Sequence, residues 1–359
     1  MSGSALEVAQ PHRWSLGRAL LLAATGICLY LLAPSIVEVF SAWQRLDQFN
    51  PIWIIVIIAC ETASFACIWG LQRIVMPDVG WFDGAMTQLV GNAFNRITPG
   101  GGATGTALQA RLLADAGHDL TGVATALTTE SLMVTLAITV LPLFSLPAIL
   151  LGLNVPGSLA DAAWIGVLVF VVVTLAGVWM LRSEQPLCRL GNGLAWIANK
   201  LRRRRPPIDG LGERLIIQRD TLRVAVGAQW LAAVSAAVGR WVFEYIGLLV
   251  ALNAIGAQPD PTLVLLAFVT AELLGLLPFT PGGLGFVEAG LTGTLALAGV
   301  GASDAVLATL VFRLVSFWLP LPVGLAASFA YRRRHPRRDG QEADAGTGES
   351  AGHTRPHDQ

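Results

Sequence analysis

Long apolar blocks of about 20 residues, separated by short polar stretches, dominate the sequence. An α-helix needs about 20 mostly apolar residues to cross roughly 30 Å of hydrocarbon. Of the 359 residues, 54% are hydrophobic and 13% are charged, whereas soluble domains carry about 25% charged residues. The pattern therefore predicts an all-α, polytopic integral membrane protein with about seven to eight helical spans. The blocks cover residues 17–40, 51–75, 121–147, 160–181, 224–252, 262–277 and 304–331.

The charged residues exclude two common classes of protein. Lys and Arg together number 24, as do Asp and Glu, and this balance disfavours a nucleic-acid partner. Every basic residue except Lys200 is Arg, and Lys200 follows Asn199. A Walker-type phosphate loop needs Gly-Lys-Ser/Thr, so an ATP-hydrolysing pump is excluded on this chain. The cysteines show no paired metal-ligand spacing, and we expect no metal and no cofactor.

The distribution of Arg predicts how the chain is oriented. The 182–223 segment holds ten basic residues, and a run of Arg follows residue 331. Cytoplasmic loops carry an excess of Lys and Arg, so both termini and this loop are expected on the inner side of a bacterial cytoplasmic membrane. With this orientation and this number of spans, residues 82–116 must enter and leave the membrane from the inner side. Residues 262–300 must do so from the outer side. Each is expected to be a re-entrant hairpin or an even pair of short helices.

Three parts are expected along the chain: a cytoplasmic head at 1–16, a membrane domain at 17–331 and a disordered cytoplasmic tail at 332–359. The 17–40 block outlasts the 7–15-residue core of a signal peptide, which favours a span. Within the membrane domain, apolar residues of the 182–223 loop recur at three- to four-residue spacing. They predict a helix on the inner leaflet, and a simple cytoplasmic linker is the alternative. These residues are Leu187, Leu190, Leu194, Ile197 and Leu201.

The string Thr-Pro-Gly-Gly occurs twice, at 98–101 and at 280–283, and the two copies are separated by about half the chain. Proline lacks an amide donor and glycine favours non-helical angles, so each string breaks a helix. Backbone groups freed at that depth must meet protein, water or a ligand, because lipid cannot satisfy them. Glu130 follows Thr98 at almost the same spacing at which Arg313 follows Thr280. Matched breaks in two oppositely oriented halves predict an inverted repeat with a substrate site, unless the short string recurs by chance.

Ionisable residues within apolar spans are costly and usually pair or face a water-filled cavity. Arg240 and Glu244, four residues apart, are expected to pair on one helical face. Glu130 and Arg313 either pair near the midplane and hold the halves together, or take part in binding. In the binding hypothesis Arg313, with Arg96 or Arg111, holds a lipid phosphate, and Glu130 and Glu288 act as counter-charges or proton carriers. Glu288 has a simpler alternative role, capping a helix that begins near Leu284.

Together these features define the candidate substrate-binding residues, and no catalytic residue is assigned. The exposed amides of the glycine-rich turns belong to the set because they can cradle an anion at a helix start. The set comprises Arg313, Glu130, Glu288, Arg96, Arg111, Thr98, Pro99, Gly100, Gly101, Thr280, Pro281, Gly282, Gly283 and Gly285.

The residues resemble those of the lysylphosphatidylglycerol synthase transmembrane region, a flippase-like membrane domain, over about 20–331. The resemblance rests mainly on residues 278–288 (PFTPGGLGFVE) and Arg313, and more loosely on residues 95–101 (NRITPGG) and Glu130. The chain departs from the family where Ser131, rather than Arg, follows Glu130, which puts any role of that Arg in doubt. Lysyl-transferring relatives carry a large soluble domain after the membrane part. Here only a short polar tail follows Tyr331, so we do not expect lysyl transfer by this chain alone.

Taken with the resemblance, the sequence predicts a non-enzymatic, flippase-like protein that binds and translocates an anionic phospholipid or a lipid-linked envelope precursor. Its expected partners are anionic membrane lipids, and the sequence leaves the oligomeric state open. One alternative is a scaffold that recruits a soluble lipid-modifying synthase through the 182–223 loop. Another is a lipid head-group enzyme, for which Asp115, His118 and Asp119 are the nearest acid–base material. We interpret these three as a solvated helix end.

Overall fold

The computed structural model describes residues 50–98, 102–141, 143, 182–201, 210, 227–275 and 280–335, with isolated positions between 164 and 179 and between 212 and 220. Every regular element within these residues is helical. The predicted head, the 17–40 span and residues 336–359 of the tail lie outside the described residues, as do most of the 160–181 span and Pro99, Gly100 and Gly101.

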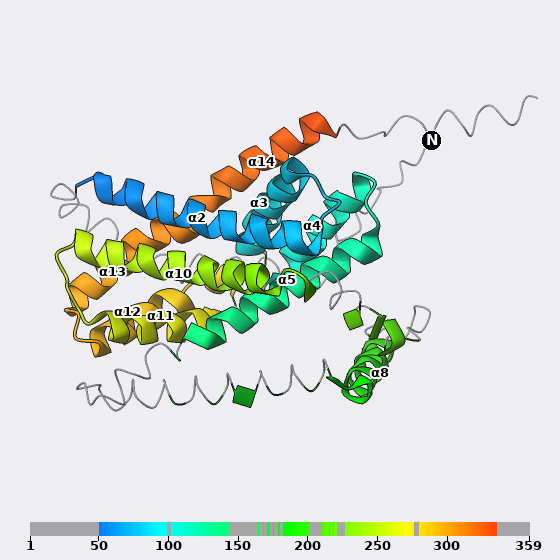
Figure 1. Ribbon diagram of the computed structural model, residues 1–359. Coiled ribbons are helices and arrows are strands. Elements are labelled where there is room, and N and C mark those ends of the chain that lie inside the picture. Colours follow the sequence, from blue (N-terminus) through cyan, green and yellow to red (C-terminus); the bar gives the residue numbers. More distant parts are fainter. Residues whose placement is uncertain are drawn as a thin grey trace, which may run out of the picture.

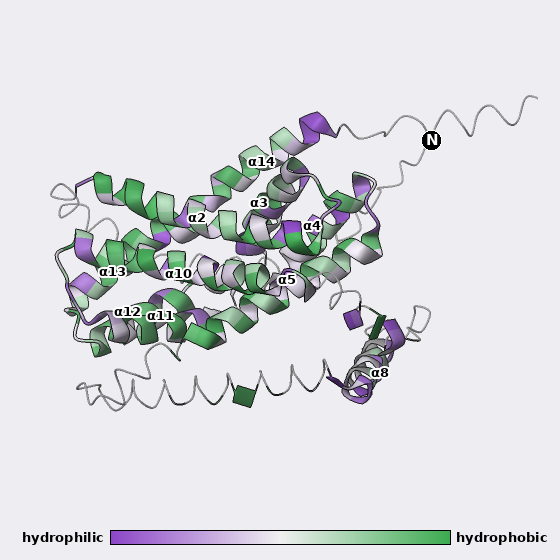
Figure 2. Cartoon of the chain, viewed as in Figure 1, coloured by the Kyte–Doolittle hydropathy of each residue, from purple (hydrophilic) through white to green (hydrophobic). Residues whose placement is uncertain are grey.

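Four helices in the described part of the chain are long and apolar enough to cross a membrane. They are α2 (Ile52–Val75), α5 (Leu120–Val140), α10 (Trp230–Ala254) and a continuous helix over Ala302–Arg334. The last combines α13 (Ala302–Arg313), the π-helical turn η3 (Leu314–Trp318) and α14 (Pro320–Arg334). They match four predicted blocks, and Figure 2 shows apolar colour along most of their length. The prediction of an all-α, polytopic membrane protein is confirmed.

Two hairpins of shorter helices complete the bundle. The first joins α3 (Trp81–Ile97) to α4 (Gly102–Asp115). The second runs from α11 (Pro261–Gly275) through η2 (Pro281–Gly283) to α12 (Phe286–Leu297). The longest of these helices has 17 residues, about 25 Å at 1.5 Å per residue and less than the roughly 30 Å hydrocarbon core. Both segments predicted to be a re-entrant hairpin or an even pair of short helices, 82–116 and 262–300, therefore contain pairs of short, packed helices.

Glycines set the close packing within the first hairpin. A methyl group at Gly91 on α3 would lie 2.8 Å from the carbonyl oxygen of Gly105 on α4. Real Cβ atoms essentially never approach that closely, so the two backbones are in direct contact. Gly324 on α14 similarly faces Ala93 and the backbone of Leu89, which brings α14 against α3.

The core of the bundle lies between α10 and its neighbours. Helix α10 packs along α2, which runs beside it in Figure 1, and it also contacts α5, α11 and α13. Phe268 on α11 is fully buried, and its ring meets the rings of Trp241 and Tyr245 on α10 and of Phe312 on α13. The indole of Trp241 donates to the carbonyl oxygen of Val134 on α5 at 2.7 Å. These contacts fix α5, α10, α11 and α13 relative to one another.

The basic loop contains the predicted helix. Helix α8 spans Glu184–Leu201 and lies apart from the bundle in Figure 1. The side chains of its apolar residues, Leu187, Leu190, Leu194, Ile197 and Leu201, lie outside the described set. The helix is confirmed, and its place on the inner leaflet stays a prediction.

Candidate functional site

The tips of the two hairpins meet inside the bundle. Helix α3 contacts η2, so residues on either side of the first break approach the second Thr-Pro-Gly-Gly string. Gly282 adopts φ 57°, and a methyl group there would lie 2.6 Å from Phe317 and 3.2 Å from the Cα atom of Arg96. Only glycine combines this left-handed backbone with so close an approach. The repeated motif therefore joins the two halves of the described chain.

Glu288 connects the second break to α13. Its Oε1 accepts a hydrogen bond from Nε of Arg313 at 2.7 Å, and both side chains are mostly buried. Its Oε2 accepts the amide of Gly285 at 2.7 Å, at the first turn of α12. The predicted helix-capping role of Glu288 is confirmed, and the same carboxylate also binds the buried arginine. One buried nitrogen of the guanidinium, Nη2, has no hydrogen-bond partner among the described residues.

The structure corrects the predicted pairing of Glu130 with Arg313. Arg313 pairs with Glu288 instead, because α12 packs directly against α13. Glu130 lies on α5, beside α10, and its buried Oε2 has no hydrogen-bond partner within the part of the chain that the structure describes. Glu130 and Arg240, but not Arg313, line a common cavity between α3, α4, α5 and α10. Matched positions in the two halves therefore do not contact each other.

Arg96, at the end of α3, binds a side chain of its own helix and the backbone of η3. Its Nε donates to Oδ1 of Asn92 at 2.7 Å, and its Nη1 donates to the carbonyl oxygen of Ser316 in η3 at 2.6 Å. The guanidinium groups of Arg96 and Arg313 lie 5.1 and 4.6 Å from the ring centre of Phe317. Arg96 and Arg111 are the two arginines proposed to bind phosphate together with Arg313, and Arg96 is the one that lies beside it. Arg111 is exposed on α4 and does not join the cluster.

Arg240 and Glu244 form the predicted pair on α10. Their Nη2 and Oε1 atoms are 2.9 Å apart, and the hydroxyl of Ser64 on α2 lies 3.5 Å from the same carboxylate oxygen. Nη1 of Arg240 is buried, and no described residue provides a hydrogen-bond partner for it. The pair leaves Arg240 able to donate further hydrogen bonds.

A polar cavity of about 230 Å³ lies between the first hairpin and α2, α5 and α10. Glu130 and Arg240 both line it, together with amide side chains from α3 and α4. Among the residues that the structure describes, the cavity lining carries five buried polar atoms without a hydrogen-bond partner, although such atoms are rare in folded proteins. They are Gln88 Oε1, Asn95 Oδ1, Gln109 Nε2, Glu130 Oε2 and Arg240 Nη1.

The amides of this cavity are residues that the motif-based prediction missed. Gln88, Asn92 and Asn95 follow one another at four- and three-residue spacing on α3, and Gln109 faces them from α4. That spacing places side chains on one helical face. This spacing is the sequence signal by which the amides could have been found, because amide side chains form no recognised binding motif.

The two strings differ at their threonines. The Thr98 hydroxyl donates to the carbonyl oxygen of Phe94 at 2.7 Å and lies 2.8 Å from the hydroxyl of Thr104 across the break. The buried Thr280 hydroxyl has no hydrogen-bond partner in the described ranges of the chain. Gly283 and Gly285 adopt φ values of 72° and 83°, which favour glycine at both positions. The side chain of Pro281, like Pro99, Gly100 and Gly101, lies outside the described set.

The residues considered for head-group chemistry, Asp115, His118 and Asp119, lie where α4 ends and α5 begins. Asp119 caps α5, and its Oδ2 accepts the amide of Gly122 at 2.6 Å. Asp115 is exposed near the end of α4. Within the described residues, no three His, Cys, Asp or Glu side chains are grouped to hold a metal ion. The interpretation as a solvated helix end fits these positions.

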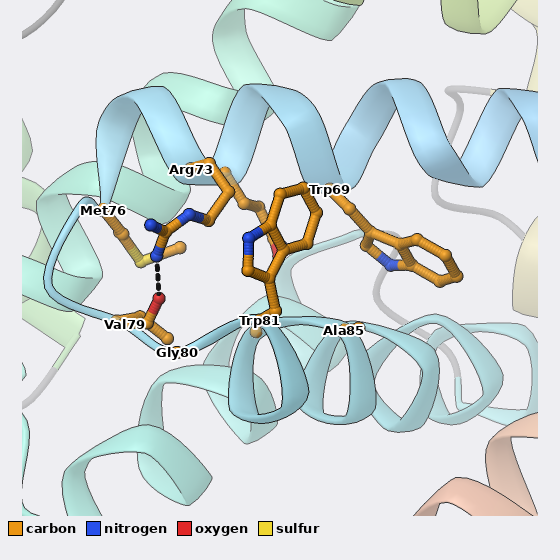
Figure 3. Close-up of a pocket in the computed structure, with 9 residues that line it drawn as sticks. Trp69, Arg73, Met76, Val79, Gly80, Trp81 and Ala85 are labelled. Atoms are coloured by element: carbon orange, nitrogen blue, oxygen red, sulfur yellow. Dashed lines mark hydrogen bonds between the residues drawn. The ribbon is translucent and has the colours of Figure 1, made fainter.

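A second, smaller cavity lies at the turn between α2 and α3 (Figure 3). Its volume of about 10 Å³ accommodates no more than about one water molecule. Arg73 donates to the carbonyl oxygen of Val79 at 2.6 Å and lies 5.5 Å from the ring centre of Trp81. These contacts hold the turn, and the cavity is too small for a lipid head group.

Long apolar helices, paired short hairpins and buried charges define a polytopic membrane protein with a polar interior. The family model of the lysylphosphatidylglycerol synthase TM region matches residues 15–324, and the chain belongs to this family. It is similar to a UPF0104 membrane protein of Methanothermobacter thermautotrophicus, with 22% identity over 316 residues, 85% of this chain and 92% of the relative. Another match to a protein so named in this archaeon has 33% identity over 97 residues, 27% of this chain and only 28% of that relative's length.

Proposed function

We propose that this protein binds and translocates an anionic phospholipid or a lipid-linked envelope precursor across the cytoplasmic membrane, and that it does so without covalent chemistry. The observation that carries the proposal is the meeting of the two hairpin tips beside a cavity rich in unpartnered polar atoms. Lipid does not satisfy such groups, so a polar ligand or water must do so.

A chain of polar contacts connects the cavity to the second hairpin. Asn92 lines the cavity and binds Arg96, which binds the backbone of η3. The guanidinium groups of Arg96 and Arg313 both contact the ring of Phe317, and Arg313 in turn binds Glu288, where the chain of contacts ends. In the proposed function, a lipid head group moves along this route while its acyl chains stay in the bilayer. The free Nη2 of Arg313 is the donor available to a lipid phosphate.

The proposed orientation follows the positive-inside rule. Both termini and the basic loop face the cytoplasm, α3–α4 is a re-entrant hairpin from the inner side, and α11–α12 is its counterpart from the outer side. Seven to eight spans in two inverted halves complete this arrangement. Broken helices that meet from opposite sides are typical of transporters that expose one site alternately to the two surfaces.

Lipid translocation is tested by reconstituting the purified protein into liposomes with fluorescent phosphatidylglycerol. Quenching with an impermeant reductant then measures the movement of lipid between leaflets. We expect movement well above that in empty vesicles, and a loss of at least about tenfold in Arg313→Gln, about the value of one hydrogen bond to a charged group. Arg332→Gln, which changes an exposed arginine of α14, is the matched control. Movement equal to that in empty vesicles would overturn the proposal.

A second candidate role is recruitment of a soluble lipid-modifying protein through the 182–223 loop. It is favoured by α8, where the exposed Trp196 lies 4.9 Å from the Lys200 ammonium and offers an aromatic, basic surface. Deleting the loop from the full chain separates the two roles. Translocation in liposomes is retained if the bundle alone moves lipid, whereas cellular function is lost if recruitment is the task.

A further inference from the structure

The cavity between α3, α4, α5 and α10 combines hydrogen-bond donors and acceptors that lack partners. Gln88 and Gln109 are 7% and 6% exposed, yet each has an unpartnered atom among the cavity-lining residues. A buried polar atom without a partner costs about 1–3 kcal/mol. Several such atoms around one cavity point to a ligand whose groups replace the missing partners.

Two of these atoms fix the chemistry that the ligand must have. Oε1 of Gln88 only accepts hydrogen bonds, whereas Nη1 of Arg240 only donates them. A bare phosphate only accepts, and it would leave the amide oxygen of Gln88 unsatisfied. An ammonium only donates, and it would leave the Arg240 guanidinium unsatisfied. A hydroxyl both donates and accepts, so neighbouring hydroxyls satisfy both residues at once.

The ion pair at the site agrees with this chemistry. Arg240 is already paired with Glu244 at 2.9 Å, so its free Nη1 offers a hydrogen-bond donor rather than an uncompensated positive charge. Planar amides and a carboxyl group suit a head-group moiety with several hydroxyls.

The size and opening of the cavity suit the polar end of a lipid. Its volume of about 230 Å³ far exceeds the 10–15 Å³ needed for one water and is below the 300–1,000 Å³ typical of drug-sized pockets. Ser131 and Thr135 line it and are exposed, and the apolar Leu132 between them is 58% exposed. A head group can enter between polar rim residues while its acyl chains remain against the apolar surface of α5.

We propose that this cavity binds the polyhydroxylated part of a lipid head group, such as a glycerol or sugar moiety, through Gln88, Gln109, Glu130 and Arg240. This inference rests on the proposed function and narrows its substrate class. Where the lipid also has a phosphate, the phosphate lies outside this cavity, towards the arginine of α13.

The test is native mass spectrometry of the full chain with defined lipids. Phosphatidylglycerol and a monoglucosyl diacylglycerol carry neighbouring hydroxyls, whereas phosphatidic acid and phosphatidylethanolamine do not. We expect each hydroxylated lipid to be retained at least about tenfold more than the other two. Retention of the glycolipid alone would assign the hydroxyls to a sugar, and retention of phosphatidylglycerol alone to a glycerol phosphate. Equal or stronger retention of phosphatidic acid would overturn the inference.

Variants connect this retention to the cavity. Gln109→Leu and Glu130→Gln are each expected to reduce retention of the hydroxylated lipids about tenfold. Gln109→Leu is also expected to keep or raise the melting temperature, because it removes a buried atom that has no partner. Thr128→Ala, at an exposed position on α5 outside the cavity, is the matched control. Unchanged retention in both folded cavity variants would overturn the inference.

The liposome assay and the retention experiment distinguish a failure of the proposed function from a failure of the proposed binding site. If the liposomes move all four lipids equally and retention shows no preference, translocation stands and the hydroxyl-binding site is wrong. If hydroxylated lipids are retained selectively but none is moved, the site stands and the flippase function is wrong.

Discussion

The two hairpins share the same helix-breaking string but have different chemistry around it. Helices α3 and α4 bring amide side chains to a cavity, and the exposed Gly102 begins α4 at its edge. Helices α11 and α12 are mostly apolar, and they bury residues such as Phe268 and Leu291 in the main core. The second hairpin contributes Glu288, which already has two partners. The first break therefore borders a cavity lined by unpartnered polar atoms, whereas at the second break a carboxylate with two partners joins α12 to α13.

This difference separates two consequences of breaking a helix in a membrane. Freed backbone groups need partners at both breaks. At the second break, a nearby carboxylate caps the next helix and binds Arg313. At the first break, the hydroxyls of Thr98 and Thr104 hydrogen-bond to each other at the tip of the hairpin. Other polar atoms, which line the cavity, have no partner among the described residues. A repeated motif thus predicts where a chain is interrupted, while the neighbouring residues decide whether the interruption binds a ligand.

The largest expected difference between the two regions is in how much the free energy of unfolding falls when a carboxylate is removed. Glu288→Ala leaves Arg313 buried without its carboxylate partner and removes the cap of Gly285. Breaking a buried pair in this way lowers the free energy of unfolding by about 3–5 kcal/mol. Glu130→Gln removes no ion pair in the structure, and we expect it to lower stability by less than about 1 kcal/mol. Denaturant titration of both variants in the same detergent measures the difference, and equal losses would contradict the comparison.

A smaller effect is expected at the glycine that joins the hairpins. Gly282→Ala forces a side chain into a left-handed backbone and against Phe317, and we expect a loss of about 2–4 kcal/mol. Gly293→Ala on α12 is the matched control, because nothing lies within 4 Å of a methyl group there. In a helix interior, that control should stabilise by about 0.5–1 kcal/mol. Thermal unfolding reports both changes, and a well-tolerated Gly282→Ala would remove the argument that the hairpin tips are in direct contact.

The smallest expected difference concerns the two threonines of the repeated string. Thr98→Val removes hydrogen bonds to Phe94 and Thr104, at a cost of about 1 kcal/mol. Thr280→Val replaces a buried hydroxyl that has no partner, so we expect stability to be unchanged or raised. The two substitutions are chemically identical, so paired melting curves compare the breaks directly. A reversed order would show that the second break, rather than the first, depends on its threonine.

Much of this organisation could be predicted from sequence because its causes are local. Apolar length predicts the long helices, Pro and Gly predict the breaks, and the four-residue spacing of Arg240 and Glu244 predicts their pair. The partner of Arg313 could not be predicted in the same way, since it depends on how α12 packs on α13. The cavity amides were missed for a related reason. Their unpartnered state arises only when α3, α4, α5 and α10 surround one space.

The π-helical turn η3 has a consequence for the register of the long helix over Ala302–Arg334. A π-helical turn accommodates one residue more than an α-helical turn, and one residue corresponds to about 100° of rotation. The turn therefore sets the angular phase of α14 independently of α13. Gly324 thereby faces α3, and Tyr331 reaches the carbonyl oxygen of Leu112 at 2.7 Å. Deleting one residue within Leu314–Trp318 would rotate every side chain of α14 away from its partner without altering the sequence of α14 itself.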